Sequence, residues 1–125
     1  MNEQNQEACR SLTAREDLLQ VVIDGAGIQT VSDFMDLIGK ALHFPTECAG
    51  KYARFEDFIQ DLSWLPADQG VCIRITGYAG FLQSDEEGKA IIEEIFQEEV
   101  LPFWETEVTK YVKGGKPREF YIIVS

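Results

Sequence analysis

The stretch that decides the fold is residues 18–27, which read LLQVVIDGAG. The first six residues are nearly all apolar and end in β-branched side chains, whereas Asp24 and the residues after it have turn composition. This pattern predicts a buried strand that is followed by a turn.

Helical and strand patterns alternate after this turn. Thr30 is suited to cap a helix whose apolar residues recur at helical spacing until Pro45. After a loop through Gly50, a second helix is predicted with an apolar side and an acidic side. The spacing i, i+3, i+4, i+7 is taken by Phe55, Phe58, Ile59 and Leu62.

Two more apolar runs, 71–76 and 120–124, predict strands. Between them a helical pattern begins near Ile91, must kink or restart at Pro102, and continues through Trp104, Val108, Tyr111 and Val112. Its end is marked by Gly114, Gly115 and Pro117.

The predicted order is therefore β-α-α-β-α-β, which is typical of an α/β fold. Strands separated by helices can pair in parallel, because a parallel pair needs a long crossover, and apolar strands need both faces covered. We expect one domain over residues 17–125, preceded by a polar N-terminal extension, residues 1–16, that can form a helical turn or two.

Charge and composition limit the possible partners. The 125 residues include 11 Lys and Arg against 22 Asp and Glu, a formal net charge of −11, and 45% are hydrophobic. That apolar content predicts a folded chain, and the negative charge disfavours direct binding to nucleic acid or an anionic membrane. A basic protein is the expected partner.

The cysteines and the N-terminus favour the cytoplasm. Cys9, Cys48 and Cys72 cannot all pair within one chain, and none lies in a cluster that suits zinc. We expect reduced thiols, no metal and no cofactor. No cleavable signal and no run of about 20 apolar residues is recognisable.

Catalysis has little support in the sequence. His43 is the only histidine, and its place at a helix end favours a capping or packing role. Cys72 lies within a predicted strand, where a small buried side chain is expected. We therefore expect no enzyme, with a hydrolase that uses paired carboxylates as a remote alternative.

Acidic side chains are the remaining signal. Asp57 and Asp61 stand at i, i+4, a like-charge spacing that disfavours an isolated helix, and Glu56 and Gln60 lie beside them. One interpretation is a solvated outer face, helped by Arg54 three residues before Asp57. The other is a carboxylate cluster displayed to a cationic partner.

Several strings resemble the barstar family of intracellular ribonuclease inhibitors. They are VVIDG at 21–25, VSDF at 31–34, LHFP at 42–45, FEDFIQDLSWLP at 55–66 and YIIVS at 121–125. The resemblance runs from about residue 18 to the end of the chain. It implies a three-stranded parallel sheet packed with helices, and inhibition by inserting the second helix and the loop before it into the positively charged active site of a ribonuclease.

The resemblance also implies a set of contact residues. Asp57 falls on the principal inhibitory aspartate of the family. The positions in or beside the contact surface are Glu47, Lys51, Tyr52, Gln60 and Asp61, and Glu105 matches a helical glutamate that faces the nuclease. The family's second aspartate corresponds to Ala53, and an aromatic residue corresponds to Glu56.

The leading hypothesis is thus a monomeric, cytoplasmic immunity protein that binds a bacterial ribonuclease toxin in a 1:1 complex. The expected partner-binding residues are Glu47, Tyr52, Glu56, Asp57, Gln60, Asp61 and Glu105. The alternative, favoured by Ala53, is an acidic regulatory or scaffold domain that binds a basic protein other than a nuclease.

Overall fold

The computed structural model of the chain describes residues 6–66, 69–107 and 118–125. The helices and strands follow in the order α1 (Gln6–Thr13), β1 (Leu18–Asp24), α2 (Val31–Ala41), α3 (Tyr52–Ile59), β2 (Gly70–Thr76), α4 (Glu86–Glu94) and β3 (Phe120–Val124). After α1 this is the predicted order. Val108, Tyr111, Val112 and the residues predicted to end that helix lie outside the described residues.

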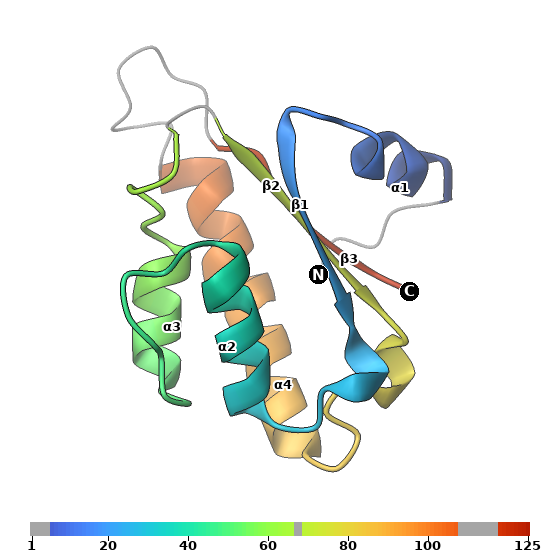
Figure 1. Ribbon diagram of the computed structural model, residues 1–125, viewed down its shortest axis with the longest axis vertical. Helices are drawn as coiled ribbons and strands as arrows, with labels where there is room; N and C mark the ends of the chain where they lie inside the picture. The colour runs from blue at the N-terminus through green and yellow to red at the C-terminus, as the bar shows by residue number, and fades with distance from the viewer. Residues whose placement is uncertain (1–5, 67–68, 108–117) are drawn as a thin grey trace.

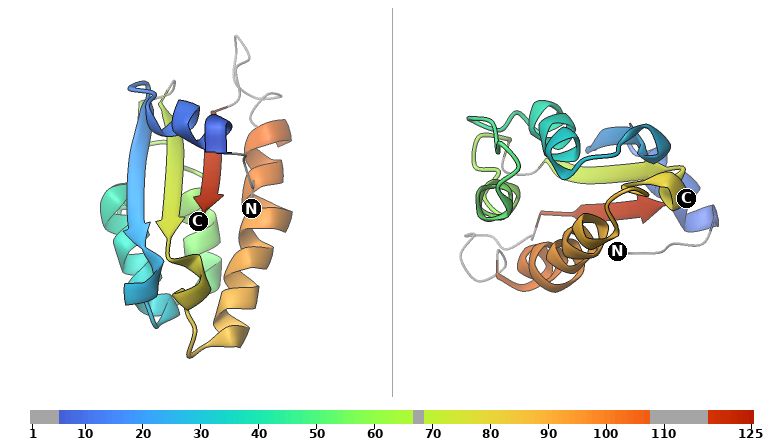
Figure 2. Two further views of the ribbon diagram at one scale, coloured as in Figure 1. Left: turned by 90° about the vertical axis from the view of Figure 1, so that its right-hand side faces the viewer. Right: turned by 90° about the horizontal axis from the view of Figure 1, so that it is seen from below.

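The three strands form one parallel sheet in the order β1-β2-β3. Val21 pairs with Ile73, and Ile73 pairs with Ile122, so the apolar centres of all three strands lie side by side. Helices α2, α3 and α4 cover one face of the sheet and α1 lies on the other (Figures 1 and 2). The predicted α/β fold is confirmed.

Local chemistry fixes the ends of the helices. The Thr30 hydroxyl accepts a hydrogen bond from the Asp33 amide at 3.1 Å, and Asp85 accepts one from the Gly88 amide at 2.9 Å. At the end of α2 the Phe44 amide donates to the Gly39 carbonyl at 2.8 Å, while His43 takes a left-handed φ of 58°. His43 therefore ends α2 through its backbone.

The turn after β1 requires glycine. A Cβ atom on Gly25 would lie 2.7 Å from the Thr76 carbonyl oxygen and 2.9 Å from Ile75. Only a residue without a side chain lets the two strand ends approach so closely. The turn composition of 24–27 thus reflects packing between strand ends.

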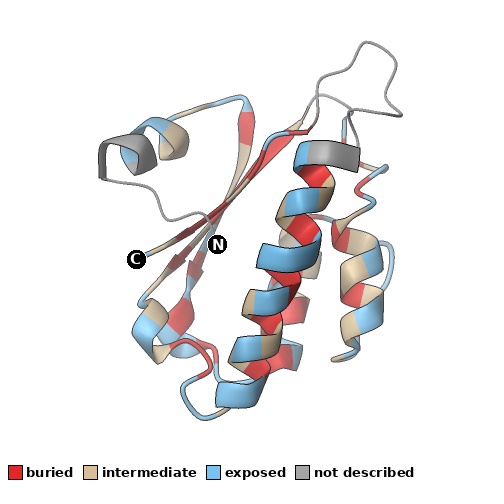
Figure 3. Cartoon of the chain, turned by 180° about the vertical axis from the view of Figure 1, so that it is seen from behind, coloured by how far each residue is buried: buried red, intermediate tan, exposed pale blue. Residues whose placement is uncertain are grey.

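The main core lies between the sheet and helices α2 to α4. Phe34, Phe55, Phe81 and Phe96 are all fully buried, and the Phe34 ring lies 5.2 to 6.2 Å from the other three. Aromatic pairs at these separations add to the stabilisation from burial. Buried residues line one side of α4, as Figure 3 shows.

Pro102 is accommodated without breaking the helix. After α4 the chain continues in wider π-helical turns over Ile95–Val100 and Phe103–Glu107. The Leu101 amide donates to the Phe96 carbonyl, five residues back, so the usual i to i−4 bonding is already replaced before the proline. Figure 2 shows the helix continuing past Pro102, so the predicted restart is wrong, and the predicted irregularity takes the form of π-helical turns on either side of the proline.

A buried arginine joins β3 to the segment after α3. The Arg118 guanidinium donates to the carbonyls of Gln69 at 2.6 Å, Leu62 at 3.2 Å and Pro66 at 3.3 Å. It also lies over the Trp104 ring, 5.3 Å from its centre. This arginine fixes where the carboxyl end of α3 lies relative to the sheet.

The N-terminal extension is helical and packed on the sheet. Leu12 of α1 contacts a small apolar cluster of Leu18, Cys72 and Ile123 on the second face. Cys72 is fully buried, as expected for a small side chain within a strand. The boundary between this extension and the domain stays a prediction.

The described residues contain neither a membrane-spanning helix nor a cluster of metal-ligating side chains. None of the described helices is long and apolar enough to span a bilayer. Within the same residues, no three side chains of the types that ligate metals gather into a cluster.

Candidate functional site

Helix α3 presents a polar side to solvent, as its apolar spacing predicts. Phe55 and Ile59 are fully buried in the main core, whereas Asp57 is exposed. Tyr52 and Glu56 are half-buried along one edge of the helix. Figure 1 shows α3 at the outside of the molecule, beyond α2. The helix therefore holds acidic groups on a rigid, accessible surface.

No cation of the described chain neutralises Asp57. The ion pairs among the described residues join Arg15 to Asp17 and to Glu119, and none of them involves a residue of α3. Arg54, expected to offset the charge of Asp57, donates instead to the Glu47 carbonyl at 3.0 Å. The carboxylate of Asp57 is thus left to solvent.

The loop before α3, residues 43–51, has an unusual backbone. His43, Ala49 and Gly50 have φ values of 58°, 54° and 73°, and a left-handed conformation is unfavourable for the two that carry a Cβ atom. The hydrogen bond from Arg54 and the buried Cys48 side chain hold this loop against the rest of the protein. Burial also raises the pKa of the Cys48 thiol. Glu47 is exposed on the outside of the loop.

A shallow groove of about 250 Å³ separates α3 from α4 and its continuation. The residues that line it are Tyr52, Glu56, Ile91, Glu94, Ile95 and Glu99. Isoleucines and a tyrosine form its apolar part, carboxylates from both helices form its polar part, and none of the described residues that line it is a lysine or an arginine. We call this feature the acidic groove.

The charges in the acidic groove affect one another. The pKa of Glu56 is raised, first by partial burial and then by the negative charges of Glu99 and Asp57. The pKa of Tyr52 is also raised, by burial and then by Asp85 and Glu87 at the start of α4. Burial is the larger cause of both shifts, and the neighbouring carboxylates act in the same direction.

The residues at the end of α3 are arranged differently from the prediction. The helix ends at Ile59, and Asp61 lies in the following turn, where its carboxylate accepts a hydrogen bond from the Ser63 amide at 3.2 Å. Asp61 is exposed and Gln60 is half-buried. The regular i, i+4 pairing of Asp57 with Asp61 on one helix is therefore not formed, because Asp61 lies beyond the last helical residue.

Glu105 reaches this side of the protein through its neighbour. The Trp104 indole nitrogen donates to the Ile59 carbonyl at 3.0 Å, which ties the Phe103–Glu107 turn to the carboxyl end of α3. Glu105 itself is exposed. It does not line the acidic groove.

Two carboxylates of the groove, Glu94 and Glu99, are absent from the predicted contact set. They are five residues apart, a spacing that a regular helix places on different sides. The π-helical turns after Glu94 bring both to the groove. Only the proline at 102 hints in the sequence that this helix is irregular.

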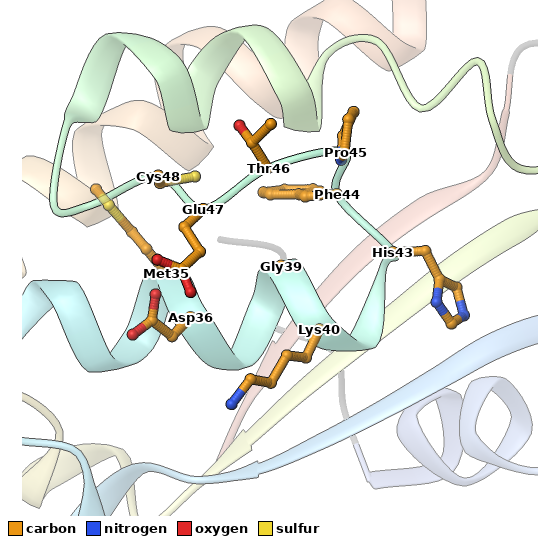
Figure 4. A pocket seen from close by; sticks show the side chains of 10 residues that line it. All are labelled: Met35, Asp36, Gly39, Lys40, His43, Phe44, Pro45, Thr46, Glu47 and Cys48. Carbon is orange, nitrogen blue, oxygen red and sulfur yellow. The ribbon is translucent and has the colours of Figure 1, made fainter.

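A larger hollow of about 460 Å³ lies between α2 and the loop 43–51 (Figure 4). Asp36, Lys40 and Glu47 line it together, so both signs of charge are present. The His43 side chain points away from these groups in Figure 4. Mixed charge makes this hollow a weaker candidate for a basic partner than the surface of α3.

The part of the chain that forms this site matches a known protein family. Residues 18–122 match the family described as Barstar (barnase inhibitor). No curated protein and no solved structure shows a significant match to the chain. The matched residues run from β1 into β3 and include α3, its preceding loop and the acidic groove, whereas α1 lies before them. Because the match spans most of the sequence, this chain belongs to the barstar family.

Proposed function

We propose that the chain inhibits a bacterial ribonuclease toxin and serves as the immunity protein against it. In this proposal α3 and the loop 43–51 enter the active site of the enzyme, and Asp57 is the central contact. The observation that carries the proposal is the exposed carboxylate of Asp57 on α3, which forms no ion pair among the described residues. Membership in a family described as barnase inhibitors supports it.

The chemistry of a ribonuclease active site explains why carboxylates suit this role. Such a site holds RNA phosphates with cationic side chains, and a carboxylate in the same place forms charge-assisted hydrogen bonds with them. Asp57 would stand where a phosphate stands, with Glu47, Tyr52, Glu56, Gln60, Asp61 and Glu105 at or beside the contact. A desolvated charge pair at the centre of an interface can contribute several kcal/mol.

The net charge of −11 also favours fast association with a basic enzyme. Complementary charge can raise association from about 10⁵–10⁶ to about 10⁸–10⁹ per molar per second at low salt. Speed matters for an immunity protein, because every free toxin molecule cleaves RNA until it is bound. Binding should therefore weaken as salt rises.

Protonation of Glu56 offers a second expectation. Its pKa is raised in the unbound protein by burial and neighbouring carboxylates, and a cation of the partner would lower it again. Binding at mildly acidic pH should then release protons. A partner without positive charge would have the opposite effect, because further burial alone raises the pKa of a carboxyl group.

The proposal includes where and how the protein works. We expect a monomer in the cytoplasm that forms a 1:1 complex and needs no cofactor or metal. It carries out no turnover: the carboxylates bind and block. Purified protein should therefore show no hydrolysis of RNA or of model esters and glycosides.

The test uses the tagged chain as bait in the cells that produce it, followed by elution with rising salt. The expected companion is a basic protein with ribonuclease activity that is suppressed until the two are separated. Barnase, named in the family's description, serves as a purified second probe. An acidic companion, elution indifferent to salt, or an eluate without ribonuclease activity together with uninhibited barnase would contradict the proposal.

A second candidate function is an acidic regulatory domain that binds a basic protein other than a nuclease. The observation that favours it is Ala53, exposed on α3 at a position where the family has an aspartate. Rescue of growth separates the two candidates. Cells that express the recovered partner should survive only with this chain if the partner is a toxic ribonuclease.

A further inference from the structure

The second face of the sheet has its own covering element, α1. In this face the side chains of Leu18 and Gln20 come from β1, Cys72 from β2, and Tyr121 and Ile123 from β3. Leu12 of α1 packs on Leu18, Cys72 and Ile123, beside Tyr121. Figure 2 shows α1 lying across the strands on this side. The helix therefore shields an apolar strip that includes a fully buried thiol.

Polar contacts at its carboxyl end fasten α1. The Gln20 side-chain amide donates to the carbonyls of Leu12 at 2.8 Å and Arg15 at 3.1 Å. The Arg15 guanidinium forms two hydrogen bonds to Asp17 and two to Glu119, the latter at 2.7 and 2.9 Å. This set joins the chain after α1 to β1 and to the start of β3.

These fastenings differ in kind from those of the other helices. The Arg15, Asp17 and Glu119 side chains are partly exposed, at 31%, 64% and 43%, so their ion pairs lie in high dielectric and are screened by salt. Helices α2 and α3, in contrast, bury phenylalanines that are fully inaccessible. Elements held by exposed bonds and little apolar contact open with a smaller free energy than the core.

The family match adds an independent observation. It begins at residue 18, the first residue of β1, so α1 is an addition to the matched domain. The sheet and the three helices of the other face contain the elements from β1 onward. The family match thus covers the sheet and the three helices of the other face without α1, which lies on the second face.

We propose that α1 is a lid on the second face of the sheet, latched by Arg15, which opens while the rest of the domain stays folded. Opening uncovers Leu18, Cys72, Ile123 and Tyr121. Val22, 67% exposed, lies on the same face, and Arg74 separates it from Ile123 within one row of the sheet. The lid occupies the strip in the closed state, and its opening is favoured by salt.

Thiol labelling of the full chain tests the lid directly. Cys72 lies under α1 and Cys48 lies in the core of the other face, so one molecule contains a reporter and a control. A thiol reagent is added under native conditions and peptide mass spectrometry gives a labelling rate for each cysteine. We expect Cys72 to react faster than global unfolding allows, and faster still at high salt.

Three variants sharpen the test. Leu12→Ala should raise the Cys72 rate roughly five- to tenfold, as expected when part of a leucine's burial is lost, and Arg15→Gln should raise it and remove the effect of salt. Arg10→Gln makes the same charge change on an exposed residue of α1 that forms no ion pair among the described residues, and should change neither rate. The Cys48 rate should stay constant throughout.

Other results would overturn the lid. If Cys72 and Cys48 rates rise by the same factor in Leu12→Ala, α1 unfolds only with the whole domain. If Cys72 reacts only at the rate of global unfolding in every variant, α1 does not open. Failure of Leu12→Ala or Arg15→Gln to fold would equally contradict the proposal, since a lid can be loosened without loss of the domain.

Discussion

The two faces of the sheet are stabilised in contrasting ways. On the helix face, aromatic and aliphatic side chains from three helices interlock in one continuous core. On the second face, the described cluster has three buried side chains, with Leu12 and Tyr121 packed against them, and exposed ion pairs around Arg15 complete the cover. The comparison indicates that most of the stability comes from the helix face, and it is consistent with the proposal that the cover of the second face opens separately.

The two faces of the sheet also differ in how rigidly their helices are held. The candidate binding helix α3 belongs to the rigid face, where Phe55 and Ile59 anchor it. A preorganised helix loses little conformational entropy when a partner binds, which favours tight association. Placing an acidic surface on the well-packed face therefore suits an inhibitor.

The largest effect on stability is expected in the aromatic core. Phe34→Ala removes a fully buried ring that contacts Phe55, Phe81 and Phe96, and should lower the free energy of unfolding by about 3–5 kcal/mol. Leu37→Ala, on the same helix but 45% exposed, is the matched control and should cost about 1 kcal/mol or less. Urea unfolding gives both values, and equal losses would contradict the account of the core.

A somewhat smaller loss is expected at the buried arginine. Arg118→Met keeps the length of the side chain but removes the donors to the Leu62, Pro66 and Gln69 carbonyls. Losing these bonds should lower stability by about 2–3 kcal/mol. Arg118→Lys should recover only part of it, because one ammonium cannot reproduce the planar fork. Full recovery by lysine would argue against the geometry.

Leu12→Ala compares the second face with the first. The side chain is partly buried and lies on a separate cluster, so we expect a loss of global stability of about 1 kcal/mol or less. Urea unfolding measures this value alongside Phe34→Ala. If the two losses were similar, both faces would belong to one cooperative core and the comparison would fail.

The smallest effects are opposite responses to pH on the two faces. Hydrogen bonds from Arg15 hold the pKa of Glu119 below its ordinary 4.5, so that ion pair stabilises the fold above pH 4.5 and is lost as pH falls through the lowered value. Partial burial and neighbouring charges raise the pKa of Glu56 above 4.5, so folding favours its protonated form. This preference stabilises the fold at low pH, and the stabilisation is lost as pH rises through the raised pKa.

Two glutamine variants test these signs. Glu119→Gln should lower the melting temperature at neutral pH but leave it nearly unchanged well below pH 4.5. Glu56→Gln should raise the melting temperature at neutral pH, with the difference again fading in acid. The same sign for both variants at neutral pH would contradict the assignment of charges to the two faces.

Much of the fold follows from the sequence, for physical reasons. The apolar runs at 18–23, 71–76 and 120–124 predict the three strands because they are short, nearly all apolar and rich in β-branched residues, although Val22 of β1 stays 67% exposed. Thr30 predicts the start of α2, since its hydroxyl accepts the Asp33 amide. These features depend on local composition and spacing, which a sequence displays directly.

Other features depend on contacts that local patterns do not contain. The π-helical turns lie on either side of Pro102, and spacing rules built on 3.6 residues per turn miss them. The packing of α1 depends on Arg15 meeting Glu119, 104 residues away in the chain. A polar N-terminal segment gives no sign of that partner.

The candidate site was partly predictable for the same reasons. The amphipathic spacing of α3 places Asp57 outward, as the structure confirms, and its proposed role comes from the family resemblance. Glu94 and Glu99 were missed because only the irregular helix brings them beside Glu56. Arg54, expected to offset Asp57, is turned toward the Glu47 carbonyl by the loop that precedes α3.

The central claim is that the exposed charge of α3 blocks a ribonuclease, and the dissociation constant of Asp57→Ala tests it most directly. The ribonuclease recovered on the wild-type chain is titrated with wild type, Asp57→Ala and Glu16→Gln, an exposed carboxylate of the opposite side that forms no ion pair among the described residues. We predict that Asp57→Ala weakens binding by at least about 2 kcal/mol, roughly thirtyfold, while Glu16→Gln binds like wild type and both variants keep their stability. Binding by Asp57→Ala within about twofold of wild type, or equal losses in both variants, would contradict the account.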